Sequence, residues 1–139
     1  MSNYYNQSIY STGTITYQDL DISLKPNPFT GDLRVKTDAD AVKQAIATLL
    51  YLNFGEVPFN PTVGAGLGGL LFEPLDLITQ VTLTNAIANC INNFEPRVSI
   101  ISLQVTEDPA NNALAVSLAF NMLNITQPIS VNILLQRSR

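Results

Sequence analysis

Four carboxylates are the only charged side chains between Lys43 and Arg97 in this sequence: Glu56, Glu73, Asp76 and Glu95. Glycoside hydrolysis uses two carboxylates, about 5 to 9.5 Å apart, on either side of a sugar-binding cleft. By count these residues could supply such a pair. However, the chain has no tryptophan to stack on a sugar, and Glu56 and Glu73 lie in segments whose backbone is set by proline and glycine. We therefore expect a protein that is not an enzyme, with a peptidoglycan hydrolase as the alternative.

Other catalytic chemistries have even less support. The sequence contains no histidine, which excludes Ser-His and Cys-His nucleophiles and histidine metal sites. Cys90 is the only cysteine, and it falls on an apolar helix face, so we expect a buried structural thiol. The glycines at 64, 66, 68 and 69 lack the lysine and the preceding buried strand of a phosphate loop. We expect neither a cofactor nor a metal site.

A run of special residues follows the first helix candidate. Residues 55–64 read Gly-Glu-Val-Pro-Phe-Asn-Pro-Thr-Val-Gly, and two further glycines follow at positions 66 and 68. Two prolines three residues apart, together with these glycines, fix an irregular backbone path. This pattern favours a rigid, shaped contact surface over an active site.

The order of four segments carries a family resemblance. An amphipathic helix, Gly-Glu-x-Pro-x-x-Pro-x-x-Gly at 55–64, Leu-Leu-Phe-Glu-Pro at 70–74 and Glu-Pro-Arg at 95–97 follow one another. Together they resemble the small baseplate wedge family of contractile-tailed phages, which includes a type VI secretion relative and is sometimes labelled lysozyme-like. The resemblance runs from about Phe29 to the C-terminus. It implies a structural subunit of the virion tail baseplate, assembled in the host cytoplasm, that joins the wedge core and initiates sheath assembly.

The resemblance also implies partner-binding residues. Glu95, Pro96 and Arg97 form the tripeptide that the family associates with docking onto the core bundle of neighbouring wedge subunits, and Glu56 belongs to the other shared motif. An arginine held by a proline-fixed backbone can make a planar, bidentate contact with a carboxylate. Without the resemblance, the tripeptide would be a helix stop with one local ion pair. If that pair is exposed, Arg97→Ala should cost at most about 1 kcal/mol and still block incorporation into wedges.

A second contact is expected at the C-terminal sheet. The segment around Val131, Asn132 and Ile133 is an apolar strand near the chain end, where a sheet edge is open. In sheath initiators of this kind, arms of the sheath subunit add strands to such a sheet. The expected partners are other wedge subunits and the tail sheath protein, with tail tube or hub proteins as further candidates.

The amino-acid composition limits the kinds of partner that the protein can have. Charged residues make up 13% of the 139 residues, against roughly 25% in ordinary soluble domains, which suggests a surface covered by partners. A net charge of −4 with seven Lys and Arg argues against a nucleic-acid partner. No apolar stretch approaches the ~20 residues of a membrane span, so no membrane contact is expected. An unrelated small oligomeric scaffold stays open as a third class.

The hydrophobic periodicity predicts the elements that position these residues. We expect an extended arm over 1–18 and a single domain over 19–139, with a short strand near 19–24 and a turn at 29–32. Helices are predicted from Thr37 or Asp38 towards Gly55, and from Pro74 or Asp76 to about Asn93. Three strands follow, at 98–105, 114–120 and 130–136, with Ile101, Leu103 and Val105 on one face of the first. The predicted fold is α+β, with two main helices packed on one face of a three- to four-stranded antiparallel sheet.

Overall fold

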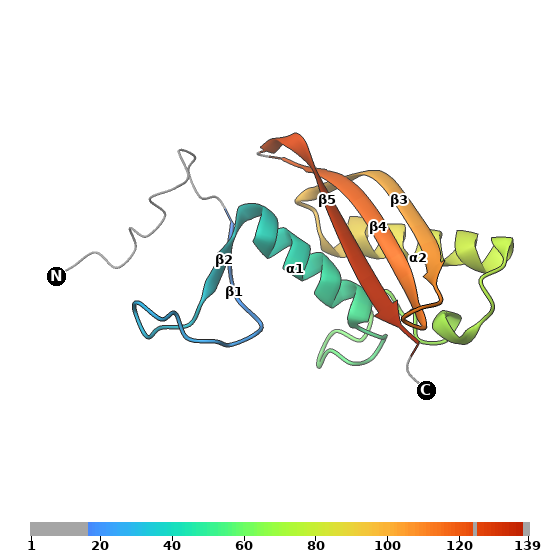
Figure 1. Cartoon of the computed structure of the whole chain (residues 1–139), viewed down its shortest axis with the longest axis horizontal. Helices are drawn as coiled ribbons and strands as arrows, with labels where there is room; N and C mark the ends of the chain where they lie inside the picture. Colours follow the sequence, from blue (N-terminus) through green and yellow to red (C-terminus); the bar gives the residue numbers. More distant parts are fainter. Residues whose placement is uncertain (1–16, 124, 138–139) are drawn as a thin grey trace. The chain divides into compact units, whose positions relative to one another are not determined.

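The structure is a computed structural model and describes residues 17–123 and 125–137. Most of the predicted N-terminal arm, residues 1–16, lies outside the described residues. The chain divides into two units, residues 1–41 and residues 42–139, with α1 crossing the division. Figure 1 shows the elements in chain order.

The first unit holds a small antiparallel pair of strands. β1 (Gln18–Leu20) pairs with β2 (Val35–Thr37). The strand predicted near 19–24 therefore exists but is shorter. It ends because the Asp21 carboxylate accepts the Ser23 N–H at 2.9 Å and the Asp21 carbonyl accepts the Leu24 N–H at 3.0 Å, which closes a turn. Aspartate often stops a strand in this way, by offering the backbone local partners.

Both predicted helices are present. α1 (Asp38–Tyr51) buries Val42, Ile46 and Leu50, as its spacing predicts. α2 (Leu77–Phe94) begins after Asp76, whose carboxylate accepts the Thr79 N–H at 2.7 Å, and ends one residue before Glu95-Pro96. Between them, η1 (Leu70–Phe72) is a single 3₁₀ turn.

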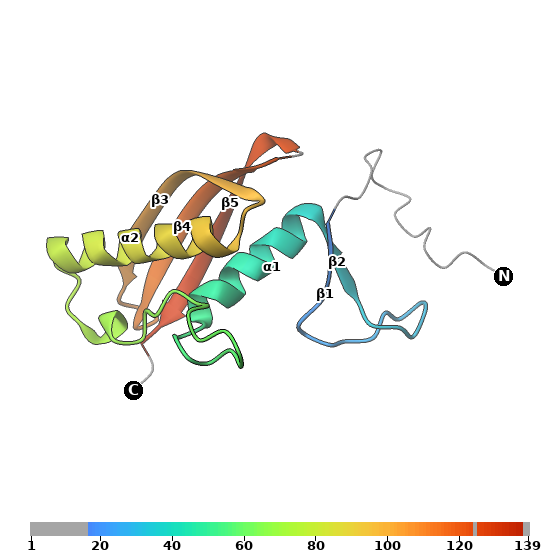
Figure 2. The same cartoon turned by 180° about the vertical axis from the view of Figure 1, so that it is seen from behind.

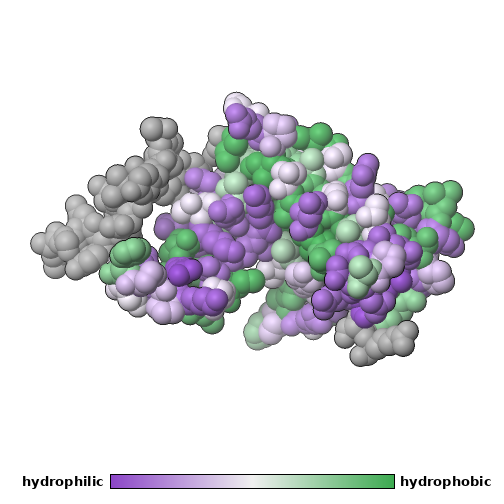
Figure 3. Space-filling model, viewed as in Figure 1, coloured by the Kyte–Doolittle hydropathy of each residue, from purple (hydrophilic) through white to green (hydrophobic). Residues whose placement is uncertain are grey.

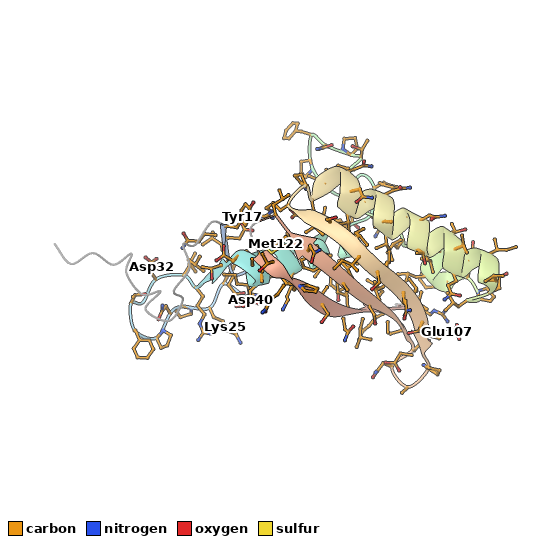
Figure 4. The ribbon with its side chains drawn as sticks, turned by 90° about the horizontal axis from the view of Figure 1, so that it is seen from above. Tyr17, Lys25, Asp32, Asp40, Glu107 and Met122 are labelled. Atoms are coloured by element: carbon orange, nitrogen blue, oxygen red, sulfur yellow. The ribbon has the colours of Figure 1, made fainter. Side chains whose placement is uncertain are left out.

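The C-terminal third is an antiparallel meander in the order β3-β4-β5. β3 spans Val98–Asp108, β4 Ala113–Met122 and β5 Ile125–Gln136. Figure 4 labels Glu107 and Met122 at opposite ends of this sheet. β4 is the central strand, and its side chains at alternate positions form much of the core, as predicted. These are Leu114, Val116, Leu118 and Phe120, each at most 1% exposed.

The prediction that Ile101 shares a face of β3 with Val105 is wrong. Ile101 is 51% exposed, whereas Val105 is buried as expected. The cause is a β-bulge, because Ile100 pairs with Phe120 and Ser102 with Ala119, which leaves Ile101 without a partner. An extra residue in one strand reverses the alternation of faces beyond it. Ile101 is therefore turned out of the core.

The α+β class is confirmed. α2 lies alongside β3 in both Figure 1 and the reverse view of Figure 2, and the Gln80 side chain donates to the Val105 carbonyl at 2.8 Å. The Tyr51 hydroxyl at the end of α1 donates to the Leu134 carbonyl of β5 at 3.0 Å. That both helices cover one face of the sheet stays a prediction. Within the described chain, no helix has the length and apolar character needed to cross a membrane.

Candidate partner-binding site

Glu95 and Arg97 form a closed ion pair at the end of α2. Arg97 donates from Nε to Glu95 Oε1 at 2.6 Å and from Nη2 to Oε2 at 2.7 Å, and its backbone N–H reaches Oε1 at 3.4 Å. The Glu95 side chain is 4% exposed and that of Arg97 is 23% exposed. Pro96, between them, is exposed. The tripeptide therefore presents proline outward and holds its two charged groups against each other.

This geometry corrects one expectation. The pair is not exposed, so the estimate of at most about 1 kcal/mol for losing Arg97 does not apply. The bidentate contact expected with a partner's carboxylate is made inside the chain instead, because Nε and Nη2 of Arg97 both donate to Glu95. A partner contact at this tripeptide stays a prediction and would have to use the outer surface around Pro96.

Glu56 has a local structural role. Its carboxylate accepts the Asn53 backbone N–H at 2.9 Å and the Asn53 side-chain amide at 3.2 Å. Asn53 in turn accepts the Gly68 N–H at 3.1 Å, so the two ends of the Pro- and Gly-rich loop are joined. The backbone bond from Asn53 lowers the pKa of Glu56. A general acid needs a raised pKa, so this environment is the opposite of what hydrolysis requires.

The loop that Glu56 closes displays aromatic side chains. Phe54 is 64% exposed, and Phe59 is fully exposed on a backbone with φ of +66°. A positive φ is uncommon for a bulky residue. Gly64, with φ of +122°, packs so closely that a Cβ there would lie 2.5 Å from the Leu52 carbonyl oxygen. This close packing restricts the backbone of the loop. That the loop forms a contact surface stays a prediction.

Among the described strands, β5 is at an edge of the sheet and pairs with β4 alone. The three residues predicted to bind a partner here differ in placement. Ile133 is buried, Val131 is half-buried and Asn132 is exposed. The side chain of Ile133 therefore belongs to the core and is not available to a partner.

The hydrogen bonds at the end of β5 show which backbone groups face outward. The Arg137 N–H donates to the Asn112 carbonyl, which continues the β4–β5 register, and the Leu134 carbonyl points away from β4 to accept the Tyr51 hydroxyl. In an antiparallel ladder, bonded and non-bonded pairs alternate. Asn132, two residues from Leu134, must then direct its N–H and C=O to the open edge. Val131 and Ile133 must direct theirs to β4.

The opposite edge of the sheet is partly covered. The side-chain amide of Gln80 in α2 donates a hydrogen bond to the outward-facing carbonyl of Val105 on β3. A cleft of about 350 Å³ lies beside it, between α2 and β3. Sequence reasoning missed both Gln80 and Tyr51, because a side chain that caps a distant strand leaves no local signal. On each edge, therefore, one outward carbonyl accepts a hydrogen bond from a helix side chain, Val105 from Gln80 and Leu134 from Tyr51.

Two of the four carboxylates singled out from the sequence are held in local contacts. Glu95 is held by Arg97 and Glu56 by Asn53, and neither the 350 Å³ cleft nor a larger groove of about 790 Å³ has a carboxylate in its lining. Among the described residues, no cluster of acidic, cysteine or histidine side chains could hold a metal ion. Cys90 is buried, and burial raises the pKa of its thiol, as expected for a structural cysteine.

Residues 36–126 match the family described as baseplate wedge protein gp25. The chain belongs to this baseplate wedge family. A family relative, the baseplate wedge protein gp25 of Enterobacteria phage T4, is 24% identical over 108 residues, which cover 78% of this chain and 81% of the relative. The family resemblance inferred from the sequence is therefore confirmed.

Two solved structures share the fold of this baseplate wedge family member. One is described as a candidate tail lysozyme from Geobacter sulfurreducens, with a TM-score of 0.65 and 16% identity over 70% of this chain and 89% of that chain. The other is the cryo-EM structure of the anti-feeding prophage baseplate, with a TM-score of 0.61 and 17% identity over 88% of this chain and 87% of that chain. At these identities, the likeness concerns the fold alone.

Proposed function

We propose that this protein is a non-enzymatic baseplate subunit that joins the wedge core and initiates the tail sheath by strand addition at β5. It would be assembled in the host cytoplasm and act in the virion tail, with residues 19–139 as one wedge domain whose two helices pack on one face of the sheet. The observation that carries the sheath proposal is the exposed edge of β5.

Between Pro128 and the Leu134 carbonyl that Tyr51 covers, this edge lacks the usual protection of an edge strand. Natural proteins cover such edges or place charges on them, lysine above all. β5 contains no charged residue between Ile125 and Gln136, and its Pro128 removes one N–H near the start. From Ser130 to Gln136 the strand pairs with β4 in a regular register. An uncharged, regular edge with outward N–H and C=O groups is suited to receive a strand from a partner.

Contacts with wedge subunits would use other surfaces. In the first unit, apolar side chains are largely exposed on a two-stranded hairpin, which has little core of its own. At the start of α2, Leu77 and Ile78 are each 76% exposed, and Figure 3 shows apolar residues around this helix start. Apolar surface of this kind marks protein contacts. The exposed apolar residues of the hairpin unit are Leu20, Ile22, Leu24, Phe29, Leu33 and Val35.

Asn132→Pro tests the sheath proposal. Proline at this position removes an N–H that faces the open edge, so the pairing with β4 should survive while strand addition fails. We expect complete baseplates without sheath. Asn132→Ala, which keeps the N–H, should give sheathed tails, and thermal unfolding of both purified variants controls for folding. Normal sheath assembly by the folded Asn132→Pro variant would refute strand addition at β5.

A tail-associated peptidoglycan hydrolase is the second candidate, and the name of the Geobacter structural neighbour is what favours it. The locked positions of Glu56 and Glu95 oppose it. Purified protein should release no reducing sugar or peptide from cell walls. Lysis that disappears in Glu56→Gln or Glu73→Gln, with both variants shown to be folded by thermal unfolding, would establish the hydrolase instead.

A further inference from the structure

A groove of about 790 Å³ lies beside the last residues of β5. Its walls come from the end of α1, from η1 and from β5, which are three segments far apart in the chain. None of the lining residues is charged, so the groove offers an apolar surface with a few polar groups, as binding pockets commonly do. The lining residues are Leu50, Tyr51, Asn53, Leu67, Gly68, Leu71, Phe72, Leu134, Leu135 and Gln136.

The groove is continuous with the open half of the β5 ladder. By the alternation derived above, Ser130 and Asn132 direct both backbone groups outward, and Leu134 directs its N–H outward. The outward carbonyl of Leu134 is already occupied by the Tyr51 hydroxyl, which itself lines the groove. The residue of an added strand that lies opposite Leu134, next to the groove, therefore finds no free carbonyl there to accept its N–H.

Side-chain direction then brings a residue of the added strand to the groove. Neighbouring strands place side chains at paired positions on the same face of a sheet. Ile133 and Leu135 are 5% and 2% exposed, so their face of β5 is the buried one. A residue of the added strand beside Leu135 would point to that same face, and Leu135 lines the groove together with Leu71 and Phe72 of η1.

We propose that this groove receives one large apolar side chain of the segment that adds to β5, and that this anchor fixes the register of the added strand. The inference rests on the proposed strand addition and specifies the partner. The partner segment is extended, pairs with the Ser130–Leu135 stretch, and carries leucine, isoleucine or an aromatic residue at the position beside Leu135, next to the residue that loses its backbone acceptor. Backbone bonds alone would allow slippage by two residues, which an anchor in a pocket prevents.

The test uses tails assembled with full-length variants of this chain. A photo-crosslinking phenylalanine derivative is placed at Phe72, which is 63% exposed, and separately at Asn132. We expect both positions to crosslink to one sheath segment, with the Phe72 crosslink on a large apolar residue. A sheath crosslink from Asn132 without one from Phe72 would overturn the anchor and leave strand addition standing. Absence of sheath crosslinks from both positions would overturn both proposals.

Charge substitutions give an independent measurement. Phe72→Asp places a carboxylate in the groove and should reduce the yield of sheathed tails by about tenfold or more, the effect of roughly 1.4 kcal/mol. Ile101→Asp is the matched control, because Ile101 is 51% exposed but lies on β3, at the other edge. Its yield should stay within about twofold of the wild type. Equal yields for the two variants, or a Phe72 crosslink between two copies of this chain, would refute the proposal.

Discussion

Arg97→Ala should destabilise the folded domain, and the geometry of the Glu95–Arg97 pair sets the size of the effect. Removing the guanidinium deletes two hydrogen bonds of 2.6 and 2.7 Å and leaves the Glu95 carboxylate, 4% exposed, without its cation. Breaking a buried ion pair by removing one partner costs about 3–5 kcal/mol. Arg97 is 23% exposed, so water can enter the vacated space, and we expect the lower end, about 3 kcal/mol.

The pair also fixes the end of α2. The Glu95 N–H donates to the Ile91 carbonyl at 2.8 Å, and the Glu95 carbonyl accepts the Val98 N–H at 3.2 Å, so the same residue closes the helix and starts β3. Loss of 3 kcal/mol in a domain of this size lowers the melting temperature by roughly 10 °C. Circular dichroism of the purified variant, with urea unfolding to obtain the free energy, measures this directly.

Two further variants separate charge from geometry. Arg97→Lys keeps a positive charge but cannot make the two parallel bonds, so it should lose about 1–2 kcal/mol. Glu95→Leu combined with Arg97→Met removes both charges and should be less destabilised than Arg97→Ala alone, because no buried charge is left unpaired. If Arg97→Ala melts within about 2 °C of the wild type, the reasoning about this pair is wrong.

Three other predictions follow from local geometry. Gly64→Ala should cost about 3 kcal/mol, because the new Cβ meets the Leu52 carbonyl and the φ of +122° is strained for alanine, whereas Gly69→Ala, with open space around it, should unfold like the wild type in urea. The Thr79 N–H lowers the pKa of Asp76 below its ordinary 3.8, so the ionised carboxylate stabilises the fold above about pH 4 and this contribution is lost as the pH falls through the folded-state pKa. Asp76→Asn should therefore flatten the low-pH part of a plot of melting temperature against pH. An unchanged plot would contradict this prediction. Glu56→Gln should weaken the closure of the loop, seen as faster amide exchange at Gly68, and unaltered exchange would show that Glu56 does not hold it.

The hydrophobic period was enough to predict the helices and the meander. The spacing of Val42, Ile46 and Leu50 and the alternation of Leu114, Val116 and Leu118 hold in the structure, because one side of each element must be buried. The spacing of hydrophobic residues cannot locate a β-bulge, because a bulge depends on how two strands pair. For this reason the sequence pattern placed Ile101 on the wrong face of β3.

The candidate site was less predictable than the fold. Types and spacing alone pointed to Glu95 and Arg97 as a pair, but whether that pair was exposed depended on tertiary packing. The open edge of β5 could be expected from its place near the chain end. Which residues turn their backbone groups outward could not, because that follows from the register and from the Tyr51–Leu134 bond across 83 residues.

A cryo-EM map of the tail that includes this subunit and the first sheath ring would show whether the sheath adds a strand to β5. We expect an additional strand along β5, bonded to the outward N–H and C=O of Asn132, with an apolar side chain in the groove beside Phe72. A map in which the β5 edge is bare, or in which the sheath adds its strand to β3, would contradict it.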